Sequence, residues 1–439
     1  MTSTTRQISG SNTPSVFPPP GYQPGPSKLS GIEVYLPAGK AAPPEVMEFK
    51  CPKCGATTAY NLEMGQVTCE HCGYSETPEE KHLGRGAEGF EFLVETIARS
   101  EKGWGETRKE MACQSCGGVT SVPPDTLSFS CPFCGSNEVL CREPLEDVLR
   151  PRYLIPFKIN HPACQDITRQ WLGKSWMVSS ELRAIAGQSQ SMAEKLIPLY
   201  IPYWTFGYTC NATWKAQVAH ETIERHFING EMKEFRKVTW KEEAGKVEKV
   251  FSDLLVPGTT RLNMNALGKI DSYKIEDLVL YSPGLLAGMK AQAYDLPLAE
   301  AWDAGRQIIR EQMRQACLDR VSSTQMRNFN MSLDFSNEAW RYILVPIYTG
   351  IYHYNSKPFQ ILINGQTGQI AGPRPVDWEK IWLVFAGMLS PGLLLILVGW
   401  LFSIPQQQSV LTGVGFFMLV VAIVIEFFIF RQALDIEHV

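Results

Sequence analysis

The spacing of hydrophobic positions changes several times along this chain, and each change predicts a different element. Strand-like runs, rich in β-branched and aromatic residues, occupy "YLIPFKI" (153–159), "IPYWTFGYTCNATWKAQV" (201–218) and "EFRKVTWKEEAGKVEKVF" (234–251). Helical spacing occurs in "HPACQDITRQWLGKSW" (161–176) and "LPLAEAWDAGRQIIREQMRQACLDRVSS" (296–323). Residues 150–376 are therefore predicted to form a mixed α/β domain.

Two distant stretches of this domain resemble each other. "IPYWTFGYTCN" from Ile201 and "VPIYTGIYHYN" from Val345 share Pro, Thr, Tyr and Asn at a constant offset, which suggests an internal repeat. The second stretch runs into "QILINGQTGQIAG", where Asn-Gly and Thr-Gly punctuate short apolar runs as hairpin turns do. We expect a strand, a tight turn and a second strand there.

The last sixty residues are much more apolar than the rest. Residues 381–403 contain no charge and residues 410–430 contain one, whereas a bilayer core of about 30 Å needs about 20 apolar residues. These stretches predict two transmembrane helices; a pair of core helices is the alternative, but such helices usually keep a polar stripe. The connection "IPQQQS" is short enough to force the spans antiparallel, with both ends in one compartment.

Charges beside the spans predict their orientation. Lys380 and Arg431 flank the two ends, while the connecting loop has neither Lys nor Arg, so the positive-inside rule places both termini and the bulk of the chain in the cytoplasm. The N-terminus has no apolar segment of a secretory signal. We expect a multi-pass protein of the inner (cytoplasmic) membrane with a cytoplasmic tail at 431–439.

Residues 1–47 form a Pro- and Gly-rich arm with few aliphatic residues. Such a segment cannot bury enough apolar area to offset the entropy lost on ordering, so we expect disorder. Its run "FPPPGYQPGP" is typical of a spacer, and docking as polyproline II in an aromatic groove is the alternative.

Eight of the twelve cysteines fall into two units that share the frame C-x2-C-x14-C-x2-C and start 62 residues apart. Two C-x2-C pairs suit tetrahedral zinc, because each knuckle presents two sulfurs to one ion and the spacer can fold as a short β-hairpin. Glycine follows each knuckle, where the chain must turn tightly. The predicted ligands are Cys51, Cys54, Cys69, Cys72, Cys113, Cys116, Cys131 and Cys134.

The predicted metal role is structural. A short ribbon cannot stabilise itself by burial, whereas a structural zinc site is worth on the order of 10 to 16 kcal/mol, and four sulfurs leave no open coordination position for catalysis. We expect two zinc ions in tandem ribbons spanning residues 48–140; an iron–sulfur site is the alternative that spacing leaves open. His71, inside one knuckle, is expected to face solvent.

No enzyme signature accompanies these units, so we expect no catalytic residues. The sequence lacks a phosphate loop, a nucleophile elbow and H-E-x-x-H, since "HETIERH" would place His220 and His226 on different faces of a helix. The four other cysteines are expected to be small buried hydrophobic residues. Glu426 lies inside the second predicted span, where snorkelling toward the interface or pairing with Arg431 is expected and an ion path is the alternative.

Charge argues against a nucleic-acid partner. The chain carries a net charge of -4, and residues 48–138 hold 8 Lys and Arg against 14 Asp and Glu, a balance of -6. Phosphate contact needs basic side chains, and only Arg108 and Lys109 form a small basic cluster. Docking of proteins is therefore the favoured role of the ribbons, and a membrane-tethered nucleic-acid-binding protein is the alternative.

Taken together, the double cysteine unit, "LIPFKI", "RQWLGKSW", "YIPYWTFGY", "LVPGT", "ILVPIYTGIYHY" and "LINGQTGQIAGPRP" before a membrane hairpin resemble a bacterial family. That family is labelled "TFIIB-type zinc ribbon" or, misleadingly, "primosomal protein N′ (replication factor Y) helicase". The resemblance covers about residues 48–430. It implies a membrane anchor associated with flotillin-like (SPFH) and phage-shock-type (PspA) membrane-stress systems.

These observations predict an α+β multidomain protein: two zinc ribbons with four cysteine ligands each, a mixed α/β domain with an internal repeat, and a C-terminal transmembrane hairpin. The function expected from them is that of a non-enzymatic scaffold that recruits proteins to the membrane. A transporter or ion-path subunit is a further alternative, which depends on Glu426.

Overall fold

The computed structural model describes residues 22–25, 34–37, 49–78, 81–91, 103–105, 107–124, 126, 129–142, 148–182, 196–228, 231–354, 357–401 and 405–437. The chain divides into two units, Met1–Met47 and Glu48–Val439. In the first unit, β1 (Tyr22–Gly25) and β2 (Val34–Pro37) pair antiparallel. The rest of that unit, with its predicted disorder, lies outside the described residues.

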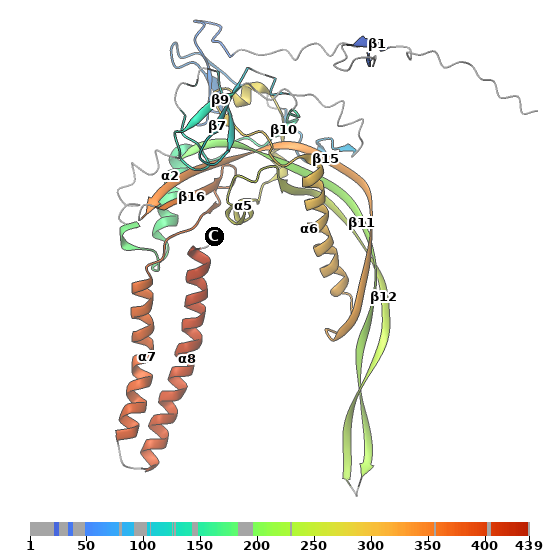
Figure 1. Cartoon of the computed structure of the whole chain (residues 1–439), viewed down its shortest axis with the longest axis vertical. Coiled ribbons are helices and arrows are strands. Elements are labelled where there is room, and N and C mark those ends of the chain that lie inside the picture. The colour runs from blue at the N-terminus through green and yellow to red at the C-terminus, as the bar shows by residue number, and fades with distance from the viewer. Residues whose placement is uncertain are drawn as a thin grey trace, which may run out of the picture. The chain divides into compact units, whose positions relative to one another are not determined.

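Three long strands dominate the second unit (Figure 1). They are β11 (Ile197–Ile228), β12 (Glu231–Pro257) and β15 (Met326–Tyr354), and β11 pairs antiparallel with both of the others. The predicted strands at 201–218 and 234–251 are thus confirmed as parts of much longer strands. On β11 the even-numbered residues from Phe206 to Val218 are buried, so one face of the sheet builds the core.

The helix α6 (Leu298–Leu318) covers this face of the sheet. Its Trp302 ring meets the edge of Phe206 at 5.1 Å between centroids and lies 5.0 Å from Tyr208. Apolar residues at helical spacing place Ile309 and Met313 on the same buried stripe. The long helix predicted from the sequence is therefore confirmed, because its apolar stripe matches the alternating stripe of β11.

The other face of β11 packs against α5 (Met264–Ile270). Strands β16 (Lys357–Asn364) and β17 (Ile370–Ala371) extend the same sheet beyond β15 and also contact α5. Helix α2 (His161–Gly173) begins after Asn160, whose side chain accepts a hydrogen bond from the amide of Ala163. The expected strand–turn–strand at the end of the domain is confirmed as β16 and β17, which pair antiparallel.

The remaining described elements are short. The expected strand at 153–159 is limited to Tyr153–Leu154, because Pro156 has no backbone N–H for a sheet hydrogen bond. The short elements are β3 (Ala59–Asn61), β4 (Gln66–Thr68), β5 (Ser75–Glu76), β6 (Phe90–Glu91), β7 (Lys109–Cys113), β8 (Val119–Val122), β9 (Val139–Arg142), β10 (Tyr153–Leu154), β13 (Val279–Leu280), β14 (Lys290–Ala291), and the 3-10 helices η1 (Gly84–Gly86), η2 (Ile275–Asp277) and η3 (Pro283–Leu286).

Bulges interrupt the pairing of the long strands. The register of β11 shifts against both partners near Gly207, and again against β15 between Lys215 and Gln217. Asp253, Asn337 and Asn328 supply the extra residues and have φ of 60°, 52° and 54°. Asp and Asn tolerate this left-handed conformation better than other residues with a Cβ, so the bulges follow from the sequence.

The two similar stretches lie side by side. Ile201, at the start of the first stretch, pairs with Val345, at the start of the second, in adjacent antiparallel strands. Each stretch then continues into a strand that folds back, β12 after the first and β16 after the second. This arrangement is compatible with a repeat, and the repeat itself stays a prediction.

At the C-terminus, α7 (Trp378–Leu401) and α8 (Pro405–Glu437) form a helical pair. A Cβ on Gly392 would lie 2.9 Å from Leu419, and one on Gly399 would lie 3.0 Å from Thr412. The later residue of α7, Gly399, thus lies beside the earlier residue of α8, Thr412, so the two helices run antiparallel. The expected loop "IPQQQS" is wrong in part: from Pro405 it is helical, since Pro is well suited to a first helical position.

Candidate functional site

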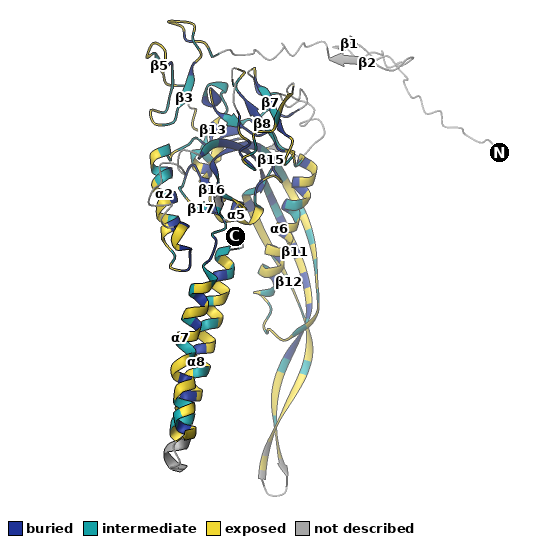
Figure 2. Cartoon of the chain, turned by 60° about the vertical axis from the view of Figure 1, so that its left-hand side comes forward, coloured by how far each residue is buried: buried dark blue, intermediate teal, exposed yellow. Residues whose placement is uncertain are grey.

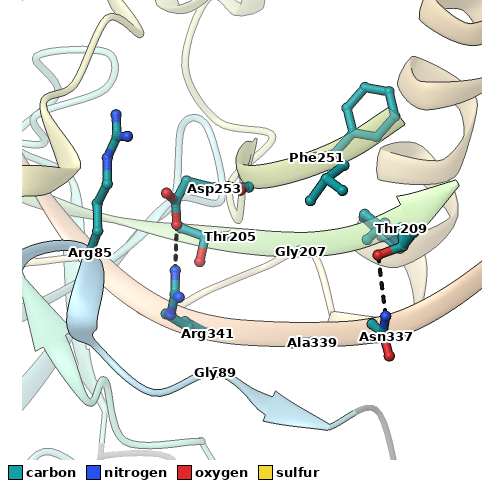
Figure 3. A pocket seen from close by; sticks show the side chains of 13 residues that line it. Arg85, Gly89, Thr205, Gly207, Thr209, Phe251, Asp253, Asn337, Ala339 and Arg341 are labelled. Atoms are coloured by element: carbon teal, nitrogen blue, oxygen red, sulfur yellow. Dashed lines mark hydrogen bonds and ion pairs between the residues drawn. The ribbon is translucent and has the colours of Figure 1, made fainter. Parts of the chain in front are cut away.

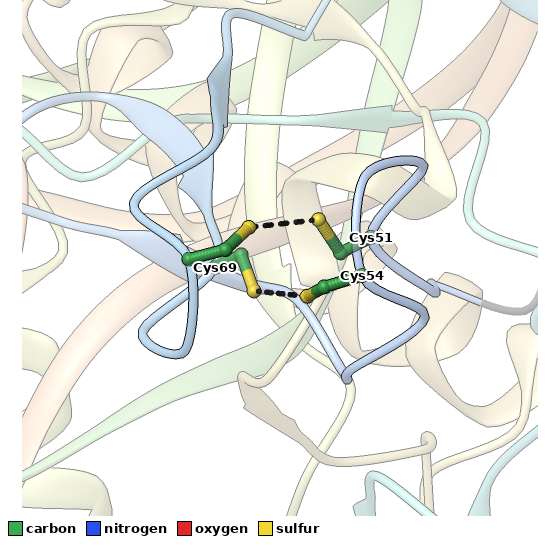
Figure 4. A group of neighbouring side chains, drawn as sticks. Cys51, Cys54 and Cys69 are labelled. Atoms are coloured by element: carbon green, nitrogen blue, oxygen red, sulfur yellow. Dashed lines mark hydrogen bonds between the residues drawn. The ribbon is translucent and has the colours of Figure 1, made fainter.

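The first tetrathiol cluster joins Cys51, Cys54, Cys69 and Cys72 (Figure 4). All four sulfurs lie within 4.8 Å of one another. The cross-knuckle pairs are 3.4 Å apart for Cys51 and Cys72 and 3.6 Å apart for Cys54 and Cys69. Antiparallel pairing of β3 with β4 brings the two knuckles together.

The second tetrathiol cluster repeats this geometry with Cys113, Cys116, Cys131 and Cys134. Here Cys113 and Cys134 are 3.6 Å apart, and Cys116 and Cys131 are 3.7 Å apart. A tetrahedron with metal–sulfur bonds of about 2.3 Å has edges of about 3.8 Å. The sulfur spacing therefore fits one tetrahedral ion in each cluster, and both four-cysteine groups expected from the sequence are brought together.

All four knuckles have the same backbone hydrogen bonds. In the first, the amide of Gly55 donates to the carbonyl of Cys51 at 2.8 Å, and the amide of Cys51 donates to the carbonyl of Ala56 at 2.7 Å. The glycine of each knuckle has φ between 69° and 76°, where a Cβ is strained. The sequence frame thus dictates the turn that aims both sulfurs at one point: Gly55, Gly73, Gly117 and Gly135 hold equivalent positions.

Crowding of the thiols shifts their ionisation. Burial opposes ionisation of Cys51, but backbone amides of its own knuckle and the Cys72 thiol outweigh it and lower the pKa of Cys51 to about 7. A backbone hydrogen bond opposes the shift at Cys54, but burial and the adjacent sulfurs raise the pKa of Cys54 to about 12. Four neighbouring thiolates repel one another, so a divalent cation is what allows all four to ionise.

The two clusters are held in different ways. The first belongs to the separate sheet β3–β4–β5, which contacts the rest of the unit where the amide of Tyr60 donates to the carbonyl of Ala287 at 2.8 Å. Around the second, β7, β8 and β9 belong to the large sheet. Thr349 donates to the carbonyl of Pro132 at 2.9 Å, and buried Phe133 joins the core. The second cluster is therefore part of the main core.

Arg108, which the sequence offered as a basic contact, is buried. Its guanidinium donates to the carbonyls of Ser121 at 3.0 Å and Met289 at 2.6 Å, and lies over the ring of Trp104. Only 3% of the residue is exposed. Arg108 therefore connects β8 to the segment after η3 and is not available to a phosphate. The pattern of charges around Arg108 in the sequence does not predict this burial.

The predictions for the other cysteines and for His71 are confirmed in part. Cys164, Cys210 and Cys317 are buried as expected, but Cys141 is exposed on the last strand of the sheet, β9, so that expectation is wrong. His71 is exposed, as expected. The segment "HETIERH" is part of strand β11 and not a helix, because it continues the pairing with β12.

The helices α7 and α8 are long and apolar enough to cross a membrane. In the most apolar part of each helix, only 17% of the residues of α7 and 11% of those of α8 are buried. Figure 2 shows exposed residues along both helices. A core helix would be mostly buried, so the helices fit membrane association.

Glu426 lies on α8 within this apolar segment. One of its carboxylate oxygens, Oε1, is buried without a hydrogen-bond partner. The expected ion pair with Arg431 is not found among the described residues.

Comparisons with known proteins give one relative of similar extent. The uncharacterized protein YdjG of Bacillus subtilis (strain 168) is 23% identical over 380 residues, which cover 84% of this chain and the whole of the relative. No protein-family model and no solved structure matches the chain. The zinc-ribbon family resemblance therefore stays a prediction.

Proposed function

We propose that this chain is a membrane-anchored, metal-braced scaffold that recruits proteins to the bacterial inner membrane and has no catalytic activity of its own. The observation that carries this proposal is an apolar face on a projecting β-ribbon. The pairing of β11 with β15 ends at Val218 and Met326. Beyond Val218, among the residues that the structure describes, β11 pairs only with β12. We call residues 219–228 and 231–240 the ribbon.

Large apolar side chains gather on one face of the ribbon. Residues directly opposite one another in antiparallel strands share a face; Trp240 is opposite Ala219, Val238 opposite Glu221, and Arg236 opposite Ile223. The large apolar side chains exposed on this face are Ile223 (55%), Met232 (64%), Val238 (44%) and Trp240 (40%). Charged residues lie between them on the same face: Glu221, Arg225, Glu234 and Arg236.

The opposite face of the ribbon is mainly polar. It carries His220 opposite Thr239 and Thr222 opposite Lys237. Nearer the body, the apolar side of β11 is its even-numbered one, whereas in the ribbon it is the odd-numbered one. The alternation of apolar and polar residues thus changes phase beyond the part of β11 that α6 and β15 cover. This change favours a surface for a partner over a role in the core, since exposed apolar patches mark interaction sites.

Substitution on the two faces tests this role. We would express tagged full-length wild type, Val238→Lys and, as a matched control on the opposite face, Thr239→Lys, and extract each from membranes. Mass spectrometry should identify proteins that co-purify with the wild type and Thr239→Lys and are lost from Val238→Lys. Equal recovery from all three would contradict docking by this face.

Zinc and orientation form part of the proposal. Two sets of four cysteine sulfurs at tetrahedral spacing favour two structural zinc ions, in zinc ribbons that brace the cytosolic part. Lys380 and Arg431 beside the helical pair, with no basic residue in the connection, favour cytoplasmic termini.

The partner class and the alternatives are proposed on separate grounds. Flotillin-like (SPFH) and PspA-type proteins are proposed as partners on the family resemblance alone. Burial of Arg108 removes half of the basic cluster on which nucleic-acid binding depended. An ion path would depend on Glu426, and unchanged flux in Glu426→Gln would exclude it.

A further inference from the structure

A groove of about 320 Å³ lies over the double bulge of the long strands. Strand β11 supplies Thr205 and Gly207, β12 supplies Asp253, and β15 supplies Ala339 and Arg341 (Figure 3). It opens on the face of the sheet opposite α6. Neither tetrathiol cluster contributes a residue to it.

Small residues keep the floor of the groove open. Gly207 pairs with Ala339 across the strands, and Gly89 of the segment before β6 lies above Ala339. A Cβ on Gly89 would lie 3.1 Å from the Cβ of Ala339 and 3.8 Å from Nε of Arg341. Larger side chains at these positions would fill the space beside the guanidinium.

Two buried polar groups in the groove lack hydrogen bonds. Arg341 donates through Nη1 to Oδ1 of Asp253, but its Nε is buried without a partner. Thr205 is its cross-strand neighbour, is only 2% exposed, and its Oγ1 is also without a partner. Buried polar groups are rarely left unpaired, because each loses its hydrogen bonds to water.

Backbone strain at the groove supports the same conclusion. Asp253 and Asn337 both have positive φ, and Asn337 donates to Oγ1 of Thr209 at 3.3 Å. The bulge at Asp253 places its carboxylate where it accepts from Nη1 of Arg341, which holds the guanidinium while its Nε stays without a partner. Strained residues beside unpaired polar groups are typical of ligand sites.

We propose that this groove binds a carboxylate group. The unpaired Nε of Arg341, together with Nη2 on the same edge of the guanidinium, donates two parallel hydrogen bonds to the carboxylate, and the hydroxyl of Thr205 donates a third. The glycine-containing segment 84–89 covers the guanidinium and is held by the Tyr153 hydroxyl, which donates to the carbonyl of Glu88, and by the ion pair of Arg152 with Glu88. These contacts open when the ligand enters. The proposal is independent of the scaffold role.

The carboxylate can come from a free small acid or from the C-terminus of a peptide. Binding of succinate, of trialanine, of trialanine amide and of inorganic phosphate to the full-length protein in detergent would be measured by isothermal titration calorimetry. Trialanine should bind and its amide should not; succinate binding in addition points to small acids, and its absence to peptide termini. Equal binding of the amide, binding of phosphate alone, or binding of none would overturn the proposal.

Three variants connect binding to these residues. Thr205→Val keeps the shape and removes the hydroxyl, and Arg341→Lys keeps the charge beside Asp253 but not the two-pronged edge. Each should weaken binding about tenfold or more. The control is Thr120→Val, since Thr120 is likewise buried with an unpaired Oγ1 but lies on β8, outside the groove. Wild-type affinity in Thr205→Val and Arg341→Lys would overturn the proposal.

Discussion

Gly415 of α8 lies so close to Gly392 of α7 that a Cβ on Gly415 would stand 2.8 Å from the Gly392 carbonyl oxygen. The reverse substitution would place a Cβ on Gly392 3.1 Å from the carbonyl oxygen of Gly415. The backbones of the two helices therefore meet at this pair. Small residues at such a crossing are how membrane helices pack closely, and Pro391 precedes the contact without ending α7.

Enlarging one glycine should separate the helices. Gly415→Leu is expected to destabilise the helical pair by about 1–3 kcal/mol, because the added side chain overlaps the backbone of α7. Loss of helical circular dichroism during titration of mixed micelles with SDS measures this. Gly413→Leu is the control, since nothing lies within 4 Å of a Cβ there; equal effects of both would contradict the packing.

Loss of each tetrathiol cluster should have different consequences. Cys113→Ser is expected to unfold the main core, because Cys113 and Cys131 are packed within it, whereas Cys54→Ser should melt only the outer three-stranded sheet. Each should lower bound metal from two ions to one per chain. Metal content and thermal unfolding of the purified variants check this, and Cys141→Ser should match the wild type in both.

Arg108 should matter for stability. Arg108→Met is expected to cost about 3 kcal/mol, because it leaves the buried carbonyls of Ser121 and Met289 without their donor. Denaturant unfolding of the full chain in detergent measures the loss. The adjacent Lys109→Met should change stability much less, and a comparable loss there would argue against the hydrogen bonds as the cause.

Asp277 should make stability depend on acidity. Burial opposes its ionisation, but Lys158, with Nζ 2.5 Å from Oδ2, and Gln366 outweigh it and lower the pKa of Asp277 below 3.8. A lowered acid pKa stabilises the fold above the unfolded pKa and loses that stabilisation as the pH falls through the folded pKa.

The matching variant is Asp277→Asn. It should destabilise the protein at neutral pH by about 1 kcal/mol or less, since Lys158 is half exposed. The difference from the wild type in free energy of unfolding should shrink below pH 3.8. A difference that stays constant across this range would contradict the ion pair.

Features set by local spacing were predictable from the sequence, and features set by distant contacts were not. The cysteine frame predicted both sets of neighbouring sulfurs, and two long apolar stretches with at most one charge each predicted α7 and α8. The strand conformation of "HETIERH" depends on its pairing with β12, which the comparison with the helical H-E-x-x-H motif does not take into account. Burial of Arg108 depends on Met289, and the groove depends on bulges between three strands, so no single segment encodes either.

The zinc content of the full-length chain recovered from carbonate-washed membranes tests the central claim most directly. A membrane-anchored, metal-braced protein should stay in the pellet with two zinc ions per chain. Recovery in the supernatant, or a pelleted chain free of zinc, would contradict it.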